Sequence, residues 1–438
     1  MERYEAYKDS GVEWTGEIPV GWKVCRLRSA AAFTRGSGIK RDDVIEIGMP
    51  CVRYGELYTT YAGFINNAAS HVADDLWRSS TKANHGELVM ALTGETKRDI
   101  GPAAVNLTGV PVAIGGDTVA IRPLKQDGRF LSYALNSSYM ATQKFLDATG
   151  EIIVHLGVEK LRDEAVVLPL LAEQRAIADF LDAKTAEIDG LVADCEREVE
   201  LLQEYRKAVI SEAVTKGLDP NAPMKDSGVE WIGEIPEGWS AVRVDKVALR
   251  KSGHTPDKTN PDYWNGDIVW VSLADSPKLR NGRYISNSSS MTTSAGIAGS
   301  SAELLPKGAV LLSRDASVGL TAIAGVDLAV SQHFMAYICG VKLNNEFLRF
   351  AFLAMHQELE KLSMGSTIPT IGLPLIRKLS IPLPPREAQG QIVSYLDAKT
   401  AEIDSLIDSK RQMIEKLREY RKSLISEAVT GKFKVPGV

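Results

Sequence analysis

The chain has 438 residues, of which 44% are hydrophobic and 24% are charged, which is enough material for two or three globular domains. Its net charge of −5 argues against an indiscriminate binder of polyanions, and no apolar run approaches the roughly 18 residues that a membrane span requires. The four cysteines are widely spaced without a CxxC pair, and the N-terminal residues lack the apolar core of a signal peptide. We therefore expect a cytoplasmic protein without a zinc site or a disulfide framework.

The first element along the chain is the motif "KDSGVEWTGEIPVGW" at 8–22. It returns as "KDSGVEWIGEIPEGW" at 225–239, with thirteen of the fifteen positions identical. An internal repeat of this kind indicates that the whole chain is built twice.

Each motif is followed by a long segment, roughly 24–165 and 241–380, of short β-like runs bounded by Gly, Pro and Asp. Each segment also contains one clear helical pattern, near 129–147 and 346–362. We predict an α+β domain with a strongly twisted sheet for both. Short similar runs indicate that the two domains share one fold: 110–121 with 326–337, 85–95 with 307–317, and 150–163 with 365–378.

A long heptad pattern ends each half of the chain, bounded by Pro before it and Gly after it. "LDAKTAEID" and "EYRKAVISEAVT" in the first copy return as "LDAKTAEID" and "EYRKSLISEAVT" in the second. About 45 residues at 1.5 Å each predict helices of roughly 65–70 Å that form a mutual coiled coil. The expected apolar stripes are Leu181, Ile188, Cys195, Leu202 and Val209, widened by Leu191, Val192, Val199 and Tyr205, and Leu396, Ile403, Lys410, Leu417 and Leu424, with Leu406, Met413 and Tyr420 between them.

The order of these elements predicts their geometry. If the two ends of a domain lie close together, the first long helix ends near the start of the second, and the two helices pair antiparallel. The repeated motif then belongs to the junction between a helix end and a domain, with Trp14, Trp22, Trp231 and Trp239 as packing anchors. We expect two α+β domains related by a pseudo-two-fold axis and separated by two long antiparallel coiled-coil helices. The predicted ranges are 1–167, 168–217, 218–382 and 383–432, with a C-terminal tail at 433–438.

At this point the sequence resembles a specificity subunit of a type I restriction–modification system, over nearly its whole length. The resemblance rests on the two copies of the motif, on "LPLLAEQRAIADFLDAKTAEID" with "LPPREAQGQIVSYLDAKTAEID", and on "SGHTPDKTNPDYWNGDIVWVS" at 252–272. "REAQ" at 386–389 departs from "AEQ" at 172–174 and concerns the start of the second long helix.

The resemblance implies two target recognition domains, each reading one half of a bipartite, asymmetric site in double-stranded DNA. It implies that the long helices set the gap and dock two methyltransferase subunits, which methylate adenine N6 with S-adenosylmethionine. Restriction subunits that use ATP and Mg²⁺ complete the nuclease, so the cofactors belong to the partner subunits and none to this chain.

We find no catalytic motif in this chain. "NPDY" at 260–263 lacks the second proline of an amino-methyltransferase signature and is interpreted as a turn. "GIAGSSAELL" has no P-loop lysine, and the six histidines show no metal-ligand spacing. The chain is expected to be a non-catalytic subunit without a metal site.

Candidate DNA contacts are polar side chains on glycine-rich loops and at the ends of β-like runs, because such residues hold phosphates or read base edges. In the first domain they are Arg35, Ser37, Lys40, Arg41, then Arg53, Tyr54 and Glu56 in alternation, and Thr93, Glu95, Lys97 and Arg98. In the second domain they are Lys251, Ser252, His254, Thr255, Lys258, Ser313, Arg314, Asp315, Ser331, Gln332 and His333. We expect Arg314 and Gln332 to affect sequence preference and Lys251 to affect affinity.

Two other classes of function stay open. One is a stand-alone regulator that binds a bipartite operator, and the other is a structural tether that holds proteins and no DNA. Co-purification of a methyltransferase subunit separates the first from the main hypothesis, and loss of duplex binding by the reconstituted complex would favour the second.

Overall fold

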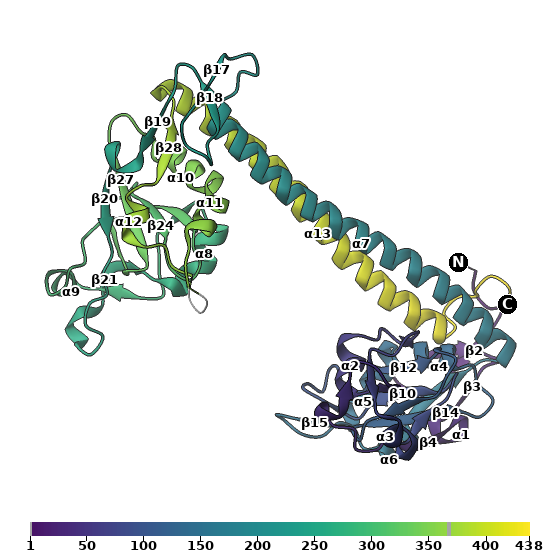
Figure 1. Ribbon diagram of the computed structural model, residues 1–438. Coiled ribbons are helices and arrows are strands. Elements are labelled where there is room, and N and C mark those ends of the chain that lie inside the picture. Colours follow the sequence, from purple (N-terminus) through teal and green to yellow (C-terminus); the bar gives the residue numbers. More distant parts are fainter. Residues whose placement is uncertain (1, 366–368) are drawn as a thin grey trace. The chain divides into compact units, whose positions relative to one another are not determined.

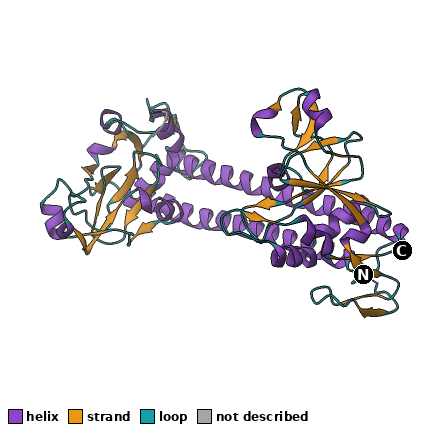
Figure 2. Cartoon of the chain, turned by 90° about the horizontal axis from the view of Figure 1, so that it is seen from below, coloured by secondary structure: helices purple, strands orange, loops and turns teal. Residues whose placement is uncertain are grey.

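The computed structural model describes residues 2–365 and 369–438. It divides the chain into two compact units: unit 1 is Met1–Glu196 with Gln412–Val438, and unit 2 is Arg197–Arg411. Both units mix strands with helices (Figure 2). Each also contains part of both long helices, α7 (Leu171–Lys216) and α13 (Arg386–Val429) (Figure 1). The predicted α+β class with two long helices is confirmed.

Unit 1 is built on two five-stranded sheets. The first has the strand order β4 (Ala31–Arg35), β14 (Thr118–Pro123), β10 (Leu88–Ala91), β12 (Ala103–Asn106), β7 (Phe64–Ile65), and it is antiparallel except between β12 and β7. The second has the order β5 (Val44–Ile45), β8 (Ser70–Val72), β6 (Met49–Val52), β13 (Val112–Ile114), β9 (Lys82–Ala83). All four residues of β10 are buried, so this strand lies in the core.

Unit 2 repeats the first of these sheets. Its strand order is β20 (Ala248–Ser252), β27 (Phe334–Cys339), β24 (Val310–Ser313), β25 (Thr321–Ala324), β22 (Tyr284–Ile285), again antiparallel except at the last pair. A three-stranded sheet lies beside it, in the order β23 (Met291–Thr292), β21 (Trp264–Val271), β26 (Leu328–Val330).

The predicted correspondence between the two domains is confirmed where the structure describes it. Strands β13 and β14 begin within 110–121, as β26 and β27 begin within 326–337. Strand β10 lies within 85–95, as β24 lies within 307–317. The short helices α6 (Val158–Asp163) and α12 (Leu373–Ile376) occupy the third pair of stretches. Residues 366–368 of that pair lie outside the described residues.

The single helix predicted in each domain is wrong, because both are divided. Residues 129–147 form α4 (Gly128–Leu135) and α5 (Ser138–Asp147), and 346–362 form α10 (Asn345–Ala354) and α11 (His356–Leu362). In unit 1 the break lies at Asn136, whose side-chain amide donates to the carbonyl of Ala103 and accepts from its N–H. These bonds tie the helix end to strand β12.

Antiparallel ribbons bring the two ends of each domain together. β3 (Lys23–Arg26) pairs with β16 (Ala165–Leu168), which leads into α7, and β19 (Ser240–Arg243) pairs with β28 (Ser380–Leu383), which leads into α13. The two ends of each domain therefore lie close together, as the prediction of antiparallel helices assumed.

The two long helices pair antiparallel within each unit. In unit 1, Arg421 donates to Asp189 and Arg418 to Glu196, both at 2.8 Å. In unit 2, Lys410 pairs with Glu198, and Arg206 donates to Asp404 at 2.8 Å. Residues later in the sequence of α7 thus contact residues earlier in the sequence of α13, as antiparallel pairing requires.

The heptad stripe forms the seam between these helices. The predicted positions Leu181, Ile188, Cys195, Val209, Leu396, Ile403 and Leu424 are buried, and Leu202, Lys410 and Leu417 are partly exposed. Leu191 and Tyr205 are exposed and do not widen the first stripe as predicted, whereas Val192 and Val199 are partly exposed. Between the positions of the second stripe, the exposed residues at 46–50% of their surface are Leu406, Met413 and Tyr420.

The opening motif lies where the sequence predicts it, against the end of α13. It forms a hairpin, β1 (Tyr7–Asp9) with β2 (Glu17–Pro19), and Lys432 donates from Nζ to the carbonyls of Thr15 and Glu17. Trp22 is buried against Gly431, which ends the helix at φ +69°, and a Cβ there would meet Pro19.

The second copy of the motif makes the same junction in unit 2. Its hairpin is β17 (Met224–Asp226) with β18 (Glu234–Pro236), and Trp239 is buried beside Gly217, which ends α7. Trp231 donates from Nε1 to the carbonyl of Ser380. Trp14 is exposed, so the predicted anchor role is wrong for this tryptophan.

A buried glutamine fixes the start of each long helix. Gln174 donates to the carbonyl of Pro169 and accepts from the N–H of Asp127. Gln389 likewise donates to the carbonyl of Pro384 and accepts from the N–H of Asn344. The "REAQ" departure therefore leaves this contact unchanged.

Candidate nucleic-acid interface

In unit 2 the central sheet brings three of the predicted clusters to one edge. Strand β27 lies between β20 and β24, and its first residues pair with the last residues of both neighbours: Ser252 faces Met335, and Ser313 faces Phe334. The loops after β20 and β24 and the loop before β27 therefore meet. These loops, with the last residues of β20 and β24, carry Ser252, His254, Thr255, Lys258, Ser313, Arg314, Asp315, Ser331, Gln332 and His333.

A chain of polar contacts connects these loops. The imidazole Nδ1 of His333 lies 2.8 Å from a carboxylate oxygen of Asp315. Its Nε2 lies 3.4 Å from the amide nitrogen of Gln332, and the hydroxyl of Thr255 donates to the amide oxygen of Gln332. Asp315 is buried and Gln332 is exposed, so the chain runs from the interior to the surface.

The loop after β20 and the loop before β27 line a cavity of about 510 Å³. Two tryptophans that the sequence analysis did not select, Trp264 and Trp270, form part of its wall and meet edge to face at 5.0 Å between ring centres. Their Nε1 groups donate to the carbonyls of Asp257 and His254. The two tryptophans thereby hold the 254–258 loop. The aromatic residues of "YWNGDIVW" are the sequence signal that could have identified them.

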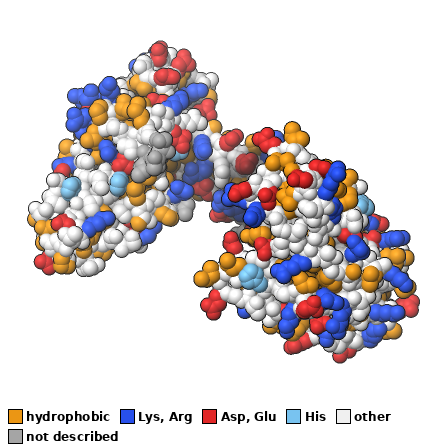
Figure 3. Space-filling view, turned by 60° about the horizontal axis from the view of Figure 1, so that its bottom comes forward, with side chains coloured by type: hydrophobic (Ala, Val, Ile, Leu, Met, Phe, Trp, Pro, Cys, Tyr) orange, Lys and Arg blue, Asp and Glu red, His pale blue; other side chains and the backbone are white. Residues whose placement is uncertain are grey.

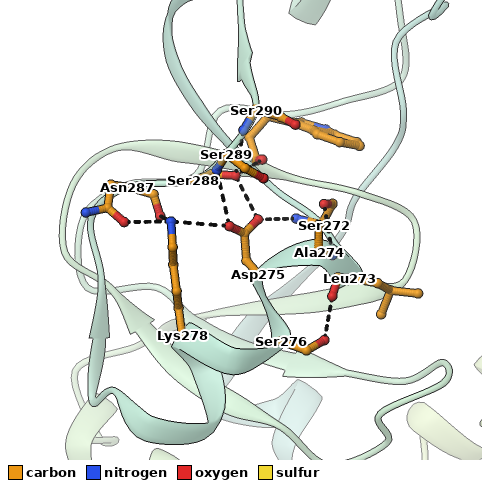
Figure 4. Close-up of polar contacts among 11 residues, drawn as sticks. Ser272, Leu273, Ala274, Asp275, Ser276, Lys278, Asn287, Ser288, Ser289 and Ser290 are labelled. Carbon is orange, nitrogen blue, oxygen red and sulfur yellow. Dashed lines mark hydrogen bonds and ion pairs between the residues drawn. The ribbon is translucent and has the colours of Figure 1, made fainter. Parts of the chain in front are cut away.

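The lining residues Ser272 and Ser290 are organised by Asp275, whose side chain is buried (Figure 4). Its carboxylate accepts from the N–H of Ser272 at 3.0 Å and from the hydroxyl of Ser288 at 2.7 Å. Lys278 lies 3.6 Å from the other carboxylate oxygen. These contacts fix Ser272 and Ser290, which line the cavity, relative to each other.

Burial divides the predicted residues of unit 2. Ser252, His254, Lys258 and Gln332 are exposed, and their direct contact with DNA stays a prediction. Ser313, Asp315 and Ser331 are buried, so we assign them a positioning role in place of direct contact.

Two predicted cations of unit 2 already have acidic neighbours. Arg314 is largely buried, lies 3.6 Å from Asp315 and faces the carbonyl of Ile371. Lys251 forms an ion pair with Glu303.

In unit 1 the equivalent sheet edge carries different side chains. Strand β4 ends at Arg35, and the Ser37 hydroxyl accepts from the N–H of Thr81. Thr93 lies 3.4 Å from Asp117 and 3.2 Å from His155, two residues that the sequence analysis missed. Arg35, Lys40, Arg41, Glu95, Lys97 and Arg98 are exposed, and Ser37 and Thr93 are partly exposed.

One predicted cluster of unit 1 has a local structural role. Arg53, Tyr54 and Glu56 do not alternate along a strand as predicted, because the chain turns into helix α2 (Tyr54–Thr59) directly after β6. Glu56 is buried and accepts from the N–H and side chain of Arg53 and from the hydroxyl of Ser70 at 2.6 Å. A glutamate in the first helical turn caps a helix in this way. Arg53 is partly exposed and Tyr54 is exposed.

The charges are mixed on the face of the molecule drawn in Figure 3, where Lys and Arg side chains are interspersed with Asp and Glu. Within residues 2–365 and 369–438, no group of three or more His, Cys, Asp and Glu residues could hold a metal ion, and the four cysteines are free. The "NPDY" stretch forms a 3-10 turn, Pro261–Tyr263, capped by Asn260, which confirms its interpretation as a turn. Across the same residues, no helix is long and apolar enough to cross a membrane.

Comparison with known proteins gives one consistent family. Residues 236–416 match the model of the type I restriction modification DNA specificity domain. The MjaIX specificity subunit of Methanocaldococcus jannaschii is 31% identical over 192 residues, or 43% of each chain. The putative MjaX specificity subunit of the same organism is 24% identical over 455 aligned residues, which cover 98% of both chains.

Solved structures show the same fold. A chain from a type I restriction–modification system has a TM-score of 0.75 at 17% identity, over 94% of this chain and 99% of that one. The HsdS subunit of Thermoanaerobacter tengcongensis has a TM-score of 0.55 at 17% identity, over 94% and 98% of the two chains.

Proposed function

We propose that this chain determines which DNA sequence a type I restriction–modification complex binds, since it belongs to the family of specificity subunits of these systems. The domains at 1–167 and 218–382 each bind one half of a bipartite, asymmetric site in double-stranded DNA. The chain itself catalyses no reaction.

One observation carries this proposal: the same sheet is present in both units, and its loops carry unlike side chains. Where unit 2 has Ser331, Gln332 and His333 between β26 and β27, unit 1 has Gly115, Gly116 and Asp117 between β13 and β14. A repeated frame holds the loops in equivalent places, and unlike side chains there recognise different base edges. Two different half-sites follow from this combination.

The paired helices support the rest of the proposal. Their buried seam and cross-helix ion pairs suit a stiff spacer that keeps the gap between the half-sites constant. The exposed apolar residues repeat in both units: Leu191 and Tyr420 lie in unit 1, and Leu406 and Tyr205 lie in unit 2. Equivalent apolar patches suit the docking of two copies of a methyltransferase subunit.

The partners supply the chemistry in this proposal. The methyltransferase subunits transfer a methyl group from S-adenosylmethionine to adenine N6, and restriction subunits use ATP and Mg²⁺. The chain's own residues select the sequence and hold the partners.

Mapping of methylated adenines in a genome that carries this chain and its modification subunit tests the proposal. We expect one bipartite motif with a constant gap. Methylation at an uninterrupted motif, or at no preferred sequence, would contradict it. Purification of the chain without any methyltransferase subunit would instead support the stand-alone regulator.

A further inference from the structure

With a neutral imidazole at His333, the polar chain at the strand ends of unit 2 has one consistent direction. The carboxylate of Asp315 can only accept, so the hydrogen of His333 lies on Nδ1. The neutral imidazole then offers a lone pair at Nε2, which faces the amide nitrogen of Gln332 at 3.4 Å. An amide nitrogen can only donate, so both neighbours of His333 require the same tautomer.

The other end of the Gln332 side chain is held as well. Thr255 donates its hydroxyl hydrogen to the amide oxygen, so the two ends of the amide are distinguished. A flipped amide would instead place its oxygen against the Nε2 lone pair of the neutral imidazole, and two acceptors would then face each other. With the neutral imidazole, Thr255 and His333 therefore set the orientation of the Gln332 amide before any ligand binds.

An amide held in this way still has one N–H and one oxygen lone pair to offer. In the major groove, adenine presents an acceptor at N7 beside a donor at N6, which matches this pair. Guanine presents two acceptors there, cytosine a single donor, and thymine an acceptor beside a methyl group. Of the four bases, adenine alone satisfies both free positions of the amide.

We infer that Gln332 reads an adenine in the half-site bound by unit 2, and that Thr255, His333 and Asp315 are positioning residues that hold its amide for this contact. The inference rests on the proposed function. It belongs to unit 2, because the corresponding loop of unit 1 has Gly115, Gly116 and Asp117 in place of the serine, glutamine and histidine.

The experiment uses the complex of the full chain with its modification subunit. The complex methylates a library of DNA duplexes randomised over the target, and the methylated duplexes are sequenced. We expect one position of one half-site to require adenine. Gln332→Ala is expected to reduce the preference for adenine there by about tenfold, and to leave the other positions unchanged. Gln332→Glu is expected to shift that position toward cytosine, because a carboxylate accepts from cytosine N4.

The positioning role has its own matched pair of variants. Thr255→Val removes the hydroxyl at nearly constant volume and is expected to weaken the preference at the same position only. Thr255→Ser keeps the hydroxyl and is expected to restore it. A general structural defect would lower methylation of every sequence and would not be rescued at one position.

Gln357→Ala serves as the control, because Gln357 is an exposed glutamine on α11 of the same unit. It is expected to leave the sequence preference unchanged. A wild-type motif that persists unaltered in Gln332→Ala, or that changes equally in Gln357→Ala, overturns the inference and leaves the proposed function standing. A wild-type complex that methylates without sequence preference overturns the proposed function itself.

Discussion

At the scale of single residues, unit 1 contains a buried ionisable pair that lies outside the proposed interface. Lys144 and Glu164 are each 3% exposed. The ammonium of Lys144 donates to the carbonyls of Gly101 and Leu135, and neither carboxyl oxygen of Glu164 has a hydrogen-bond partner among the described residues. Burial raises the pKa of Glu164 and lowers the pKa of Lys144.

The Glu164 carboxyl is expected to make stability depend on pH. Because its folded pKa is above the unfolded one, its favourable contribution is complete at low pH and is lost as the pH rises toward the folded pKa. Between about pH 5 and about pH 7.5, Glu164→Gln should gain stability relative to the wild type, by up to about 1.4 kcal/mol per pH unit. Denaturant unfolding across this range measures the difference, and a constant difference would contradict a raised pKa.

Glu173 marks a difference between the two copies of the chain. It accepts from Trp22 Nε1 at 3.0 Å and from the Tyr4 hydroxyl at 2.6 Å. The "REAQ" sequence places Ala388 at the equivalent position in unit 2. The departure from the repeat therefore has a physical reason, since unit 1 uses this glutamate to hold the segment before β1.

Glu173→Ala is expected to destabilise the chain by about 1.5–3 kcal/mol, because it removes the charged acceptor of two part-buried donors. Hydrogen exchange of residues 2–7 should become faster, whereas exchange in unit 2 should not change. Glu173→Gln keeps an acceptor oxygen and should recover most of the loss. Equal losses in both variants would show that these bonds contribute little.

At the scale of elements, the sequence predicted what depends on local periodicity and chain order. Most of the heptad positions are buried, and the repeated motif packs at the helix ends, because spacing and connectivity determine both. The exposed Leu406 and Tyr420 could not be distinguished from the seam, since hydrophobicity alone does not reveal the direction of the partner helix. The break at Asn136 and the contact between Thr255 and Gln332 join residues 33 and 77 positions apart, which no local pattern encodes.

Substitution of two leucines of α13 distinguishes residues that stabilise the helix pair from residues proposed to dock a partner subunit. Leu396 is fully buried, so Leu396→Ala should cost about 2–5 kcal/mol of unfolding free energy. Leu406 is 46% exposed, so Leu406→Ala should change stability by less than about 0.5 kcal/mol. Under the proposed docking it should nevertheless lower the amount of methyltransferase subunit that co-purifies. Unchanged co-purification would remove Leu406 from the docking surface.

At the scale of the whole molecule, the chain interleaves its two units. Unit 1 combines residues 1–196 with 412–438, so its core contains Leu424, Ile425 and Phe433 from the C-terminal part of the sequence. Backbone pairing between Glu2 and Lys434 joins the first and last segments of unit 1. Both long helices belong to both units: α7 runs from unit 1 into unit 2, and α13 runs from unit 2 into unit 1.

A matched insertion tests the proposed spacer. Seven residues inserted after Glu196 in α7 and seven after Arg411 in α13 keep the heptad phase of both helices and add about 10 Å to each. If the paired helices set the gap, the methylated motif should keep both half-sites and gain about three base pairs between them, at about 3.4 Å per base pair. Insertion into α7 alone leaves about two turns of this helix without partners on α13 and should abolish methylation. If the gap is unchanged after the matched insertion, the separation of the half-sites does not depend on helix length. Another element of the complex would then fix this distance.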